Sequence, residues 1–257
     1  MSAGRLAGIG VVVTRPRAAA EALAAPLLRE GARVWQLPAL GIEDLEPSAA
    51  LARLLANLAQ FDMAIFVSAN AVDKGLAAVR RYGAWPRGIA VAAIGEATAD
   101  ALRNSGIGPV ISPAERHDSE ALLGLAPLQV VKGQNVIVFR GEGGREHLKE
   151  TLEARGARVE YAECYRRVRP DSDPSAVVAA LARGEVHAVS VLSAETLENF
   201  IAMIGPAAVQ HLARVTLVVP HVAVGAHRDA KRFARVVIAA HGPEGLIDAL
   251  TQPRVAP

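Results

Sequence analysis

The chain contains an internal duplication, which leaves few folds open to it. Residues 8–34 align without gaps with residues 133–159, and 11 of the 27 aligned positions are identical. The same offset of 125 residues relates Arg15 to Arg140 and Ser68 to Ser193. Self-similarity at a fixed spacing is the signature of repeated structural units. The sequence therefore predicts two halves that share one fold.

Each half alternates short β-branched runs with helical patterns. Strands that are apolar throughout and alternate with helices are typical of parallel sheets covered on both faces. The fold class we predict is α/β, with two similar doubly wound parallel-sheet domains. The expected strands are 10–13, 33–37, 64–67, 90–94, 109–111, 135–139, 158–165, 188–192, 216–219 and 236–238. The expected helices are 17–30, 47–58, 70–82, 97–105, 118–125, 144–155, 174–183, 194–203, 206–213, 222–232 and 244–250.

The composition is that of a globular chain. At roughly 150 residues per domain, its 257 residues make one large domain or two small ones. Hydrophobic residues make up 51% and charged residues 21%, which excludes a disordered or fibrous chain. The single cysteine, Cys164, excludes a disulfide framework and a cysteine-based zinc site, and we expect it to be buried. With no signal peptide or bilayer-spanning stretch recognised, we expect a cytoplasmic protein that does not bind membranes.

Polar residues follow several of the expected strands, where ligands bind in open parallel sheets. Free backbone N–H groups and the helix dipole favour anions there. Thr14, Ser68 and Ser193 are placed to cap the helices that follow, and capping alone is an alternative role for each. The chain has 24 arginines against four lysines, and we attribute most of this excess to codon bias. Arg15 and Arg140 stand out because they occupy equivalent positions of the repeat. The expected anion-binding residues are Thr14, Arg15, Ser68, Ala69, Asn70, Thr98, Arg140, Gly141, Ser193, Ala194 and Glu195.

Several familiar sites are missing from the sequence. Residues 141–146 resemble a dinucleotide-binding loop, but Glu146 stands where the third glycine would fall. No phosphate-binding P-loop is present, and the seven histidines are scattered, so we expect no metal site. The basic run at 166–169 lacks interleaved aromatic residues, so we expect a solvated link and no nucleic-acid binding.

Tyr165 directly precedes this basic run. A phenol at this position can either donate a proton to a leaving oxygen or serve only in packing.

Six short motifs follow one another along the chain: VTRP at 13–16, FVSANAV at 66–72, AIGEATADAL at 93–102, DSEALL at 118–123, RGEGGREHL at 140–148 and YRR at 165–167. Together they resemble the uroporphyrinogen-III synthase family over about residues 8 to 250. No single motif is specific to this family, but the order of the motifs is. The stretch 220–225, at the end of one expected strand, departs from the pattern of the family.

The resemblance implies a definite reaction. Enzymes of this family cyclise hydroxymethylbilane, a linear tetrapyrrole polycarboxylate, with loss of water and inversion of the last pyrrole ring, and they use no cofactor. Tyr165 matches the tyrosine that the family uses to assist departure of the hydroxyl. The resemblance also implies a monomer and a transient handover of substrate from hydroxymethylbilane synthase.

The same resemblance implies that two strands link the domains and that the first domain is discontinuous. The expected bounds are 1–36 with 168–257 for one domain, 42–161 for the other, and 37–41 and 162–167 for the linker strands. Two alternatives stay open. One is a non-catalytic two-lobed protein that binds a small anion or a tetrapyrrole. The other is a nucleotide-using transferase, which the missing phosphate loops disfavour.

Overall fold

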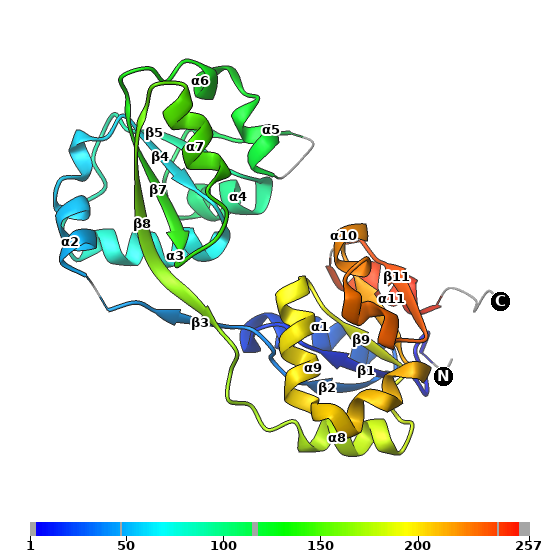
Figure 1. Cartoon of the computed structure of the whole chain (residues 1–257). Coiled ribbons are helices and arrows are strands. Elements are labelled where there is room, and N and C mark those ends of the chain that lie inside the picture. Colours follow the sequence, from blue (N-terminus) through cyan, green and yellow to red (C-terminus); the bar gives the residue numbers. More distant parts are fainter. Residues whose placement is uncertain (1–3, 47, 115–117, 241, 252–257) are drawn as a thin grey trace. The chain divides into compact units, whose positions relative to one another are not determined.

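The computed structural model describes residues 4–46, 48–114, 118–240 and 242–251, and the chain forms two compact units. The first unit combines the chain up to Gly41 with the chain from Val168 onward, and the second unit is Ile42–Arg167. The chain therefore passes twice between the units. Each unit is built on its own sheet (Figure 1).

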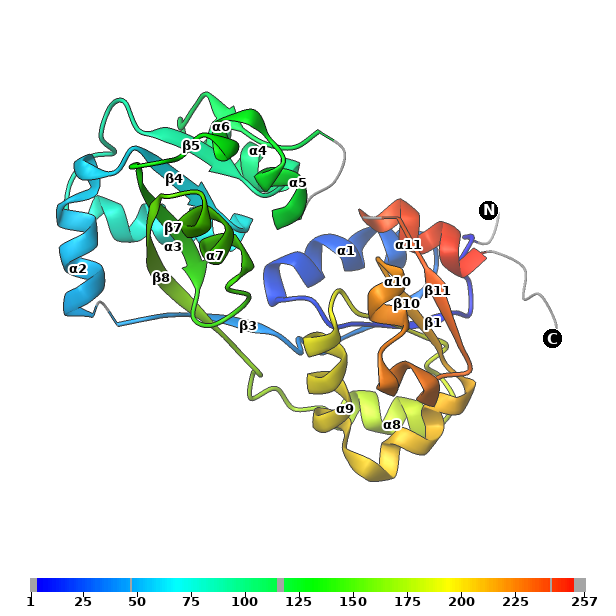
Figure 2. The ribbon, with the colours of Figure 1, turned by 45° about the horizontal axis from the view of Figure 1, so that its top comes forward.

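The sheet of the first unit has five strands in the order β11-β10-β9-β1-β2, all parallel. Val12 and Leu217 pack on one face against α8 and α9, and Val11 and Val218 pack on the other against α1 and α11 (Figure 2). The strands are β1 (Gly10–Val13), β2 (Arg33–Gln36), β9 (Ala188–Ser190), β10 (Thr216–Val219) and β11 (Arg235–Ile238). The helices are α1 (Arg17–Arg29), α8 (Ser175–Ala182), α9 (Ala194–Val209), η2 (Gln210–Arg214), α10 (Val222–Gly225), η3 (Arg228–Arg232) and α11 (Gly242–Thr251).

The sheet of the second unit has the order β3-β8-β7-β4-β5-β6 and is also covered on both faces. On one face the rings of Phe66 and Phe139 stack with centroids 4.5 Å apart under α2, α3 and α4. On the other face, α5, α6 and α7 cover Ile65 and Val138. The strands are β3 (Gly41–Asp44), β4 (Met63–Phe66), β5 (Ala90–Ala93), β6 (Val110–Ile111), β7 (Asn135–Gly141) and β8 (Arg158–Val168). The helices are α2 (Ala49–Ala56), η1 (Leu58–Gln60), α3 (Ala69–Arg80), α4 (Glu96–Asn104), α5 (Ser119–Leu123), α6 (Ala126–Gln129) and α7 (His147–Ala154).

The duplication explains why the two sheets share one strand order. An offset of 125 residues maps the first residues of β1 and β2 onto those of β7 and β8, and it maps the first residues of β4, β5 and β6 onto those of β9, β10 and β11 to within one residue. Each sheet pairs the first two strands of one repeat with the last three strands of the other. The exchange is visible in Figure 1, where blue β1 and β2 lie in the same sheet as β9 to β11 at the yellow-to-red end. The predicted α/β fold with two doubly wound parallel sheets is confirmed.

A few predicted elements differ from the structure. The expected helix 222–232 is two short helices, α10 and η3, and an additional strand, β3, forms beside β8. The first residue of the expected helix 47–58 lies outside the described residues, and that helix ends at Ala56. The helix start assigned to Thr14 is wrong, because Pro16 is the N-cap residue of α1 and provides no side-chain cap. Residues 166–168 continue β8, and Arg166 pairs with Glu43 on β3 at 3.0 Å.

Candidate functional site

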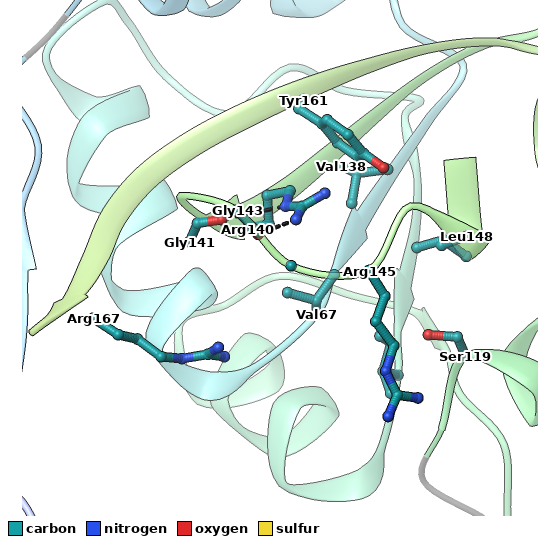
Figure 3. Close-up of a pocket in the computed structure, with 12 residues that line it drawn as sticks. Val67, Ser119, Val138, Arg140, Gly141, Gly143, Arg145, Leu148, Tyr161 and Arg167 are labelled. Atoms are coloured by element: carbon teal, nitrogen blue, oxygen red, sulfur yellow. Dashed lines mark hydrogen bonds between the residues drawn. The ribbon is translucent and has the colours of Figure 1, made fainter. Parts of the chain in front are cut away.

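A cavity of about 290 Å³ lies at the carboxyl ends of the strands of the second unit (Figure 3). Because β7, β4 and β5 are neighbours in the sheet, their ends bring side chains from distant parts of the sequence together. Apolar side chains and three arginines share the lining, a mixture suited to a ligand with apolar rings and anionic arms. The lining residues are Val67, Ile94, Ser119, Val138, Arg140, Gly141, Gly143, Gly144, Arg145, Leu148, Tyr161 and Arg167.

Arg140, predicted to bind anions, is buried and already holds the loop that follows β7. Its side chain is only 5% exposed. Nε donates to the carbonyl of Gly141 at 3.2 Å, and Nη2 donates to the carbonyl of Gly143. Nη1 donates to Oε1 of Glu146 at 3.1 Å. The guanidinium thus fastens residues 141–146 onto the end of the strand.

Tyr161 and Glu146 complete this arrangement, and neither was among the residues predicted from the sequence. The Tyr161 hydroxyl donates to Oε2 of Glu146 at 2.9 Å, and Cζ of Arg140 lies 4.3 Å from the centre of the Tyr161 ring. Burial, together with the bond to Glu146, raises the pKa of Tyr161 to about 12. The Tyr161 hydroxyl and the Arg140 guanidinium lower the pKa of Glu146. One sequence signal did exist, since Glu146 breaks the glycine pattern of its loop.

Tyr165 is fully buried, and its hydroxyl lies 3.0 Å from Oγ of Ser68. Ser68 is partly exposed and accepts a hydrogen bond from the backbone N–H of Ala71 at 3.1 Å, so its predicted role as the N-cap of α3 is confirmed. A Cβ at Gly141 would lie 2.7 Å from Cε2 of Tyr165, so only glycine leaves room for the ring. The Tyr165 hydroxyl is therefore held beside Ser68, and the partly exposed Ser68 lies between it and the first turn of α3.

The other predicted residues of the second unit lie at the same strand ends. Ala69 and Asn70 are exposed in the first turn of α3, where backbone N–H groups lack helical partners. Thr98 is in the first turn of α4, is 6% exposed and donates its backbone N–H to Gly95 at 3.0 Å. The fold thus gathers Ser68, Ala69, Asn70, Thr98, Arg140, Gly141 and Tyr165 at one edge of one sheet.

In the first unit, Thr14 and Arg15 follow the last residue of β1, and their surroundings differ. The Thr14 hydroxyl is buried and donates to the carbonyl of Ser190 on β9 at 2.7 Å. Arg15 is half-buried, and burial lowers its pKa. Its Nε is buried and makes no hydrogen bond to any described residue. Arg15, Leu192 and Pro220 line a small cavity of about 20 Å³, so a buried donor without an acceptor borders that cavity.

Ser193, Ala194 and Glu195 begin α9 at the neighbouring strand end. Ser193 accepts a hydrogen bond from the backbone N–H of Thr196 at 3.1 Å, which confirms it as the N-cap of this helix. The first turn of α9 is therefore arranged like that of α3, its counterpart in the repeat. The two units present matching helix starts, while their arginines make different contacts.

The thiol of Cys164 is buried, and burial raises its pKa to about 12, which excludes it as a nucleophile at neutral pH. Within the described ranges, no three His, Cys, Asp or Glu side chains are grouped so that they could hold a metal ion. Among the same residues, no helix has both the length and the apolar character needed to cross a bilayer.

Comparison with known proteins identifies the family. The family described as uroporphyrinogen-III synthase HemD matches residues 21–248, a span that includes strands of both sheets. The chain belongs to the uroporphyrinogen-III synthase family. The resemblance inferred from the ordered motifs is thereby confirmed.

Sequence relatives support the assignment. The chain is 34% identical over 197 residues to uroporphyrinogen-III synthase of Escherichia coli, covering 76% of this chain and 80% of the relative. It is 39% identical over 160 residues to the enzyme of the same name from Salmonella typhimurium, covering 62% of this chain and 65% of the relative. Both relatives thus match most of the length of the chain.

Solved structures share the fold. A mutant uroporphyrinogen III synthase from the extremely thermophilic bacterium Thermus thermophilus matches with a TM-score of 0.65 and 20% identity, covering 95% of this chain and all of the other. The synthetase from Helicobacter pylori matches with a TM-score of 0.59 and 14% identity over the same shares. At these identities the likeness shows a shared fold.

Proposed function

We propose that this chain is a uroporphyrinogen-III synthase, a hydro-lyase that cyclises hydroxymethylbilane to uroporphyrinogen III with inversion of the last pyrrole ring. The observation that carries the proposal is the family match over residues 21–248. The strand ends support it, because each unit offers an arginine and a serine-capped helix start, and the substrate carries acetate and propionate arms. This places the chain in tetrapyrrole biosynthesis.

The exposed first turns of α3 and α9 are suited to the substrate carboxylates. Ser68 and Ser193 each satisfy one backbone N–H, which leaves others in the turn to donate to an anion. The helix dipole adds a favourable field at the same place. We therefore assign Ala69 and Asn70, and Ala194 and Glu195, to substrate binding through their backbone.

Arg15 is the side chain we assign to a substrate carboxylate in the first unit. Its buried Nε lacks a partner among the described residues, and a buried donor without an acceptor costs free energy until one arrives. A carboxylate at the mouth of the small cavity beside Leu192 would accept this hydrogen bond. Thr14 supports Arg15 indirectly, by tying the end of β1 to β9.

Tyr165 is the residue we assign to the departure of the hydroxyl, acting through Ser68. Breaking the C–O bond requires one proton on the leaving oxygen, and closing the ring releases one proton, so the net loss is water. With Tyr165 donating to Ser68, the Ser68 hydroxyl is free to donate to the leaving oxygen. Because the substrate can also close without inversion, positioning of the chain ends decides the product.

The proposal extends to the oligomeric state of the protein, its compartment and the source of its substrate. We propose that the protein is a monomer in the cytoplasm and takes its substrate from hydroxymethylbilane synthase by transient handover. The lone buried Cys164 supports a reducing compartment. A non-catalytic tetrapyrrole-binding protein with the same fold is disfavoured by the names of its relatives.

The deciding experiment is to supply freshly prepared hydroxymethylbilane and separate the isomers after oxidation of the products. We expect the inverted isomer, III, in excess over the uninverted isomer, I. Buffer alone and heat-denatured protein are the controls and should yield isomer I. Formation of isomer I alone with the folded protein would overturn the proposal.

A further inference from the structure

Arg140 and Tyr161 together hold one carboxylate group in the second unit. Nη1 of Arg140 donates to one oxygen of Glu146, and the Tyr161 hydroxyl donates to the other, at 3.1 and 2.9 Å. A charged donor and a neutral donor aimed at the two oxygens of a carboxylate make a specific receptor for that group. Both side chains line the cavity at the strand ends, and Glu146 belongs to the chain itself.

The receptor does not depend on Glu146 for its shape. Two carbonyls of the loop accept hydrogen bonds from Nε and Nη2 of Arg140, and these bonds orient the guanidinium. The Tyr161 ring lies 4.3 Å from Cζ of Arg140, so the two donors are held next to each other by stacking. With Glu146 removed, Nη1 and the phenol hydroxyl would still face one position.

Glu146, by contrast, can leave the receptor, because its side chain is exposed. Its side chain is 52% exposed, whereas that of Arg140 is 5% exposed. It follows a loop in which Gly143 and Gly144 have φ of 69° and 113°, conformations that glycine adopts without strain. An ion pair this exposed contributes little to stability, so another carboxylate can compete for its place.

The charges around the receptor favour a carboxylate from outside. Arg145 lines the same cavity, and Nζ of Lys149, which is 3.9 Å from Oε1 of Glu153, lies 5.0 Å from the Tyr161 ring. A second acid, Glu163, lies close by: its Oε1 is 4.0 Å from Nε of Arg140 and accepts the backbone N–H of Gly143 at 3.2 Å. Without Glu146 the receptor would carry an excess of positive charge.

The receptor is a property of the second unit and does not follow from the duplication. The counterpart of Tyr161 in the first repeat is Gln36, which has neither a ring nor a phenol. The counterpart of Arg140 is Arg15, whose Nε has no partner among the described residues. The same arginine position therefore carries a built receptor in one unit and an unpartnered donor in the other.

We propose that Arg140 and Tyr161 form a carboxylate-binding subsite that Glu146 occupies and that a carboxylate arm of the substrate takes over on binding. The identity of the ligand rests on the proposed function, while the subsite itself rests on the contacts above. Glu146 is then a built-in competitor that keeps the arginine paired until substrate arrives. An incoming arm would exchange places with it and leave the number of ion pairs unchanged.

The subsite can be tested without catalysis, with sodium propionate as the probe. Glu146→Ala empties the receptor, so we expect propionate to raise the Tm of this variant above its value in sodium chloride of equal ionic strength. Wild type should show a smaller rise, since its own glutamate competes. The double variant Glu146→Ala with Tyr161→Phe should lose most of the effect, because one of the two donors is gone. Glu142→Ala, an exposed acid of the same loop, is the matched control and should behave as wild type.

A second measurement uses the reaction and a variant that preserves side-chain size. Glu146→Gln keeps the shape but weakens the competitor, so we expect a KM for hydroxymethylbilane about two- to fivefold lower, with kcat within about twofold of wild type. Glu142→Gln should leave both constants unchanged. A purely structural role for Glu146 would instead raise KM.

The outcomes separate this proposal from the proposed function. If propionate stabilises Glu146→Ala no more than Glu142→Ala, or if Glu146→Gln raises KM, the subsite is refuted even when the enzyme is active. If neither wild type nor any variant makes isomer III, the proposed function fails. The propionate experiment then still decides whether the carboxylate receptor exists.

Discussion

The hydroxyls of Ser68 and Tyr165 lie 3.0 Å apart, although the two residues are 97 positions apart in the chain. Ser68 ends the connection from β4 to α3, and Tyr165 stands near the end of β8, with the ring packed against Gly141 of β7. The pair links a buried phenol to a partly exposed helix start. Its contribution to the reaction can be separated from its contribution to the fold.

Replacing Tyr165 by phenylalanine removes only the hydroxyl. We expect kcat to fall by at least about tenfold, as for the loss of a positioned proton donor. The ring still fills its place, so the free energy of unfolding should fall by only about 1 kcal/mol for the lost hydrogen bond. Steady-state kinetics and thermal melts measure the two effects. An unchanged kcat would remove Tyr165 from the chemistry.

Replacing Ser68 by alanine should affect both stability and rate. The change removes the N-cap of α3, at a cost of about 1 kcal/mol, and it removes the group through which Tyr165 acts. Ser48→Ala is the matched control, because Ser48 caps α2 by accepting from the N–H of Leu51 at 3.1 Å and has no tyrosine partner. Ser68→Ala should lose more Tm than Ser48→Ala, because it also leaves the buried Tyr165 hydroxyl without its partner, and only Ser68→Ala should lose kcat. Equal kinetics in the two variants would mean that Ser68 is a cap and nothing more.

Replacing Arg15 should weaken substrate binding without lowering the stability of the fold. Arg15→Met removes a buried donor that has no partner in the described part of the chain, so we expect Tm to stay the same or rise. Losing a charge-assisted bond to a substrate carboxylate should raise KM by about tenfold. Arg17→Met, at an exposed arginine that begins α1, is the control. A KM for Arg15→Met equal to that of Arg17→Met would contradict the assignment.

The Glu146 network predicts a pH dependence with a definite sign. The Tyr161 hydroxyl and the Arg140 guanidinium lower the pKa of Glu146 below its ordinary value of 4.5. Its ionised form therefore stabilises the fold above pH 4.5, and this stabilisation is lost as pH falls through the lowered pKa. We expect the Tm of wild type to exceed that of Glu146→Gln by a small margin near pH 6, in keeping with the exposure of the pair, and the gap to close in acid. A gap that does not change with pH would mean that the ionised carboxylate is not the stabilising form.

Cys164 should resist thiol reagents in the folded protein. Burial raises its pKa to about 12, and its Sγ donates to the carbonyl of Ala162 at 3.3 Å. At pH 8 we expect slow labelling by a disulfide reagent and complete labelling within the mixing time in denaturant. Complete labelling of the folded protein at the denatured rate would show that the end of β8 opens freely.

The sequence by itself was sufficient for the architecture and the family. Apolar runs and helical periods depend on neighbours in the chain, so the central strands appear within a few residues of their predicted bounds. The separate helices expected at 194–203 and 206–213 correspond to a break at Gly205, whose φ is 75°. The caps at Ser68 and Ser193 were predictable for the same reason, since each serine binds an N–H three residues ahead.

Tertiary structure decided what those residues do. Thr14 looked like a helix cap, yet its hydroxyl bonds to a carbonyl 176 positions away, because β9 is the neighbour of β1 in the sheet. Arg15 and Arg140 hold equivalent places in the repeat, but only Arg140 has a glycine-rich loop and a tyrosine around it. Local periodicity encodes strands and helices, whereas hydrogen-bond partners depend on which distant segments the packed sheets bring together.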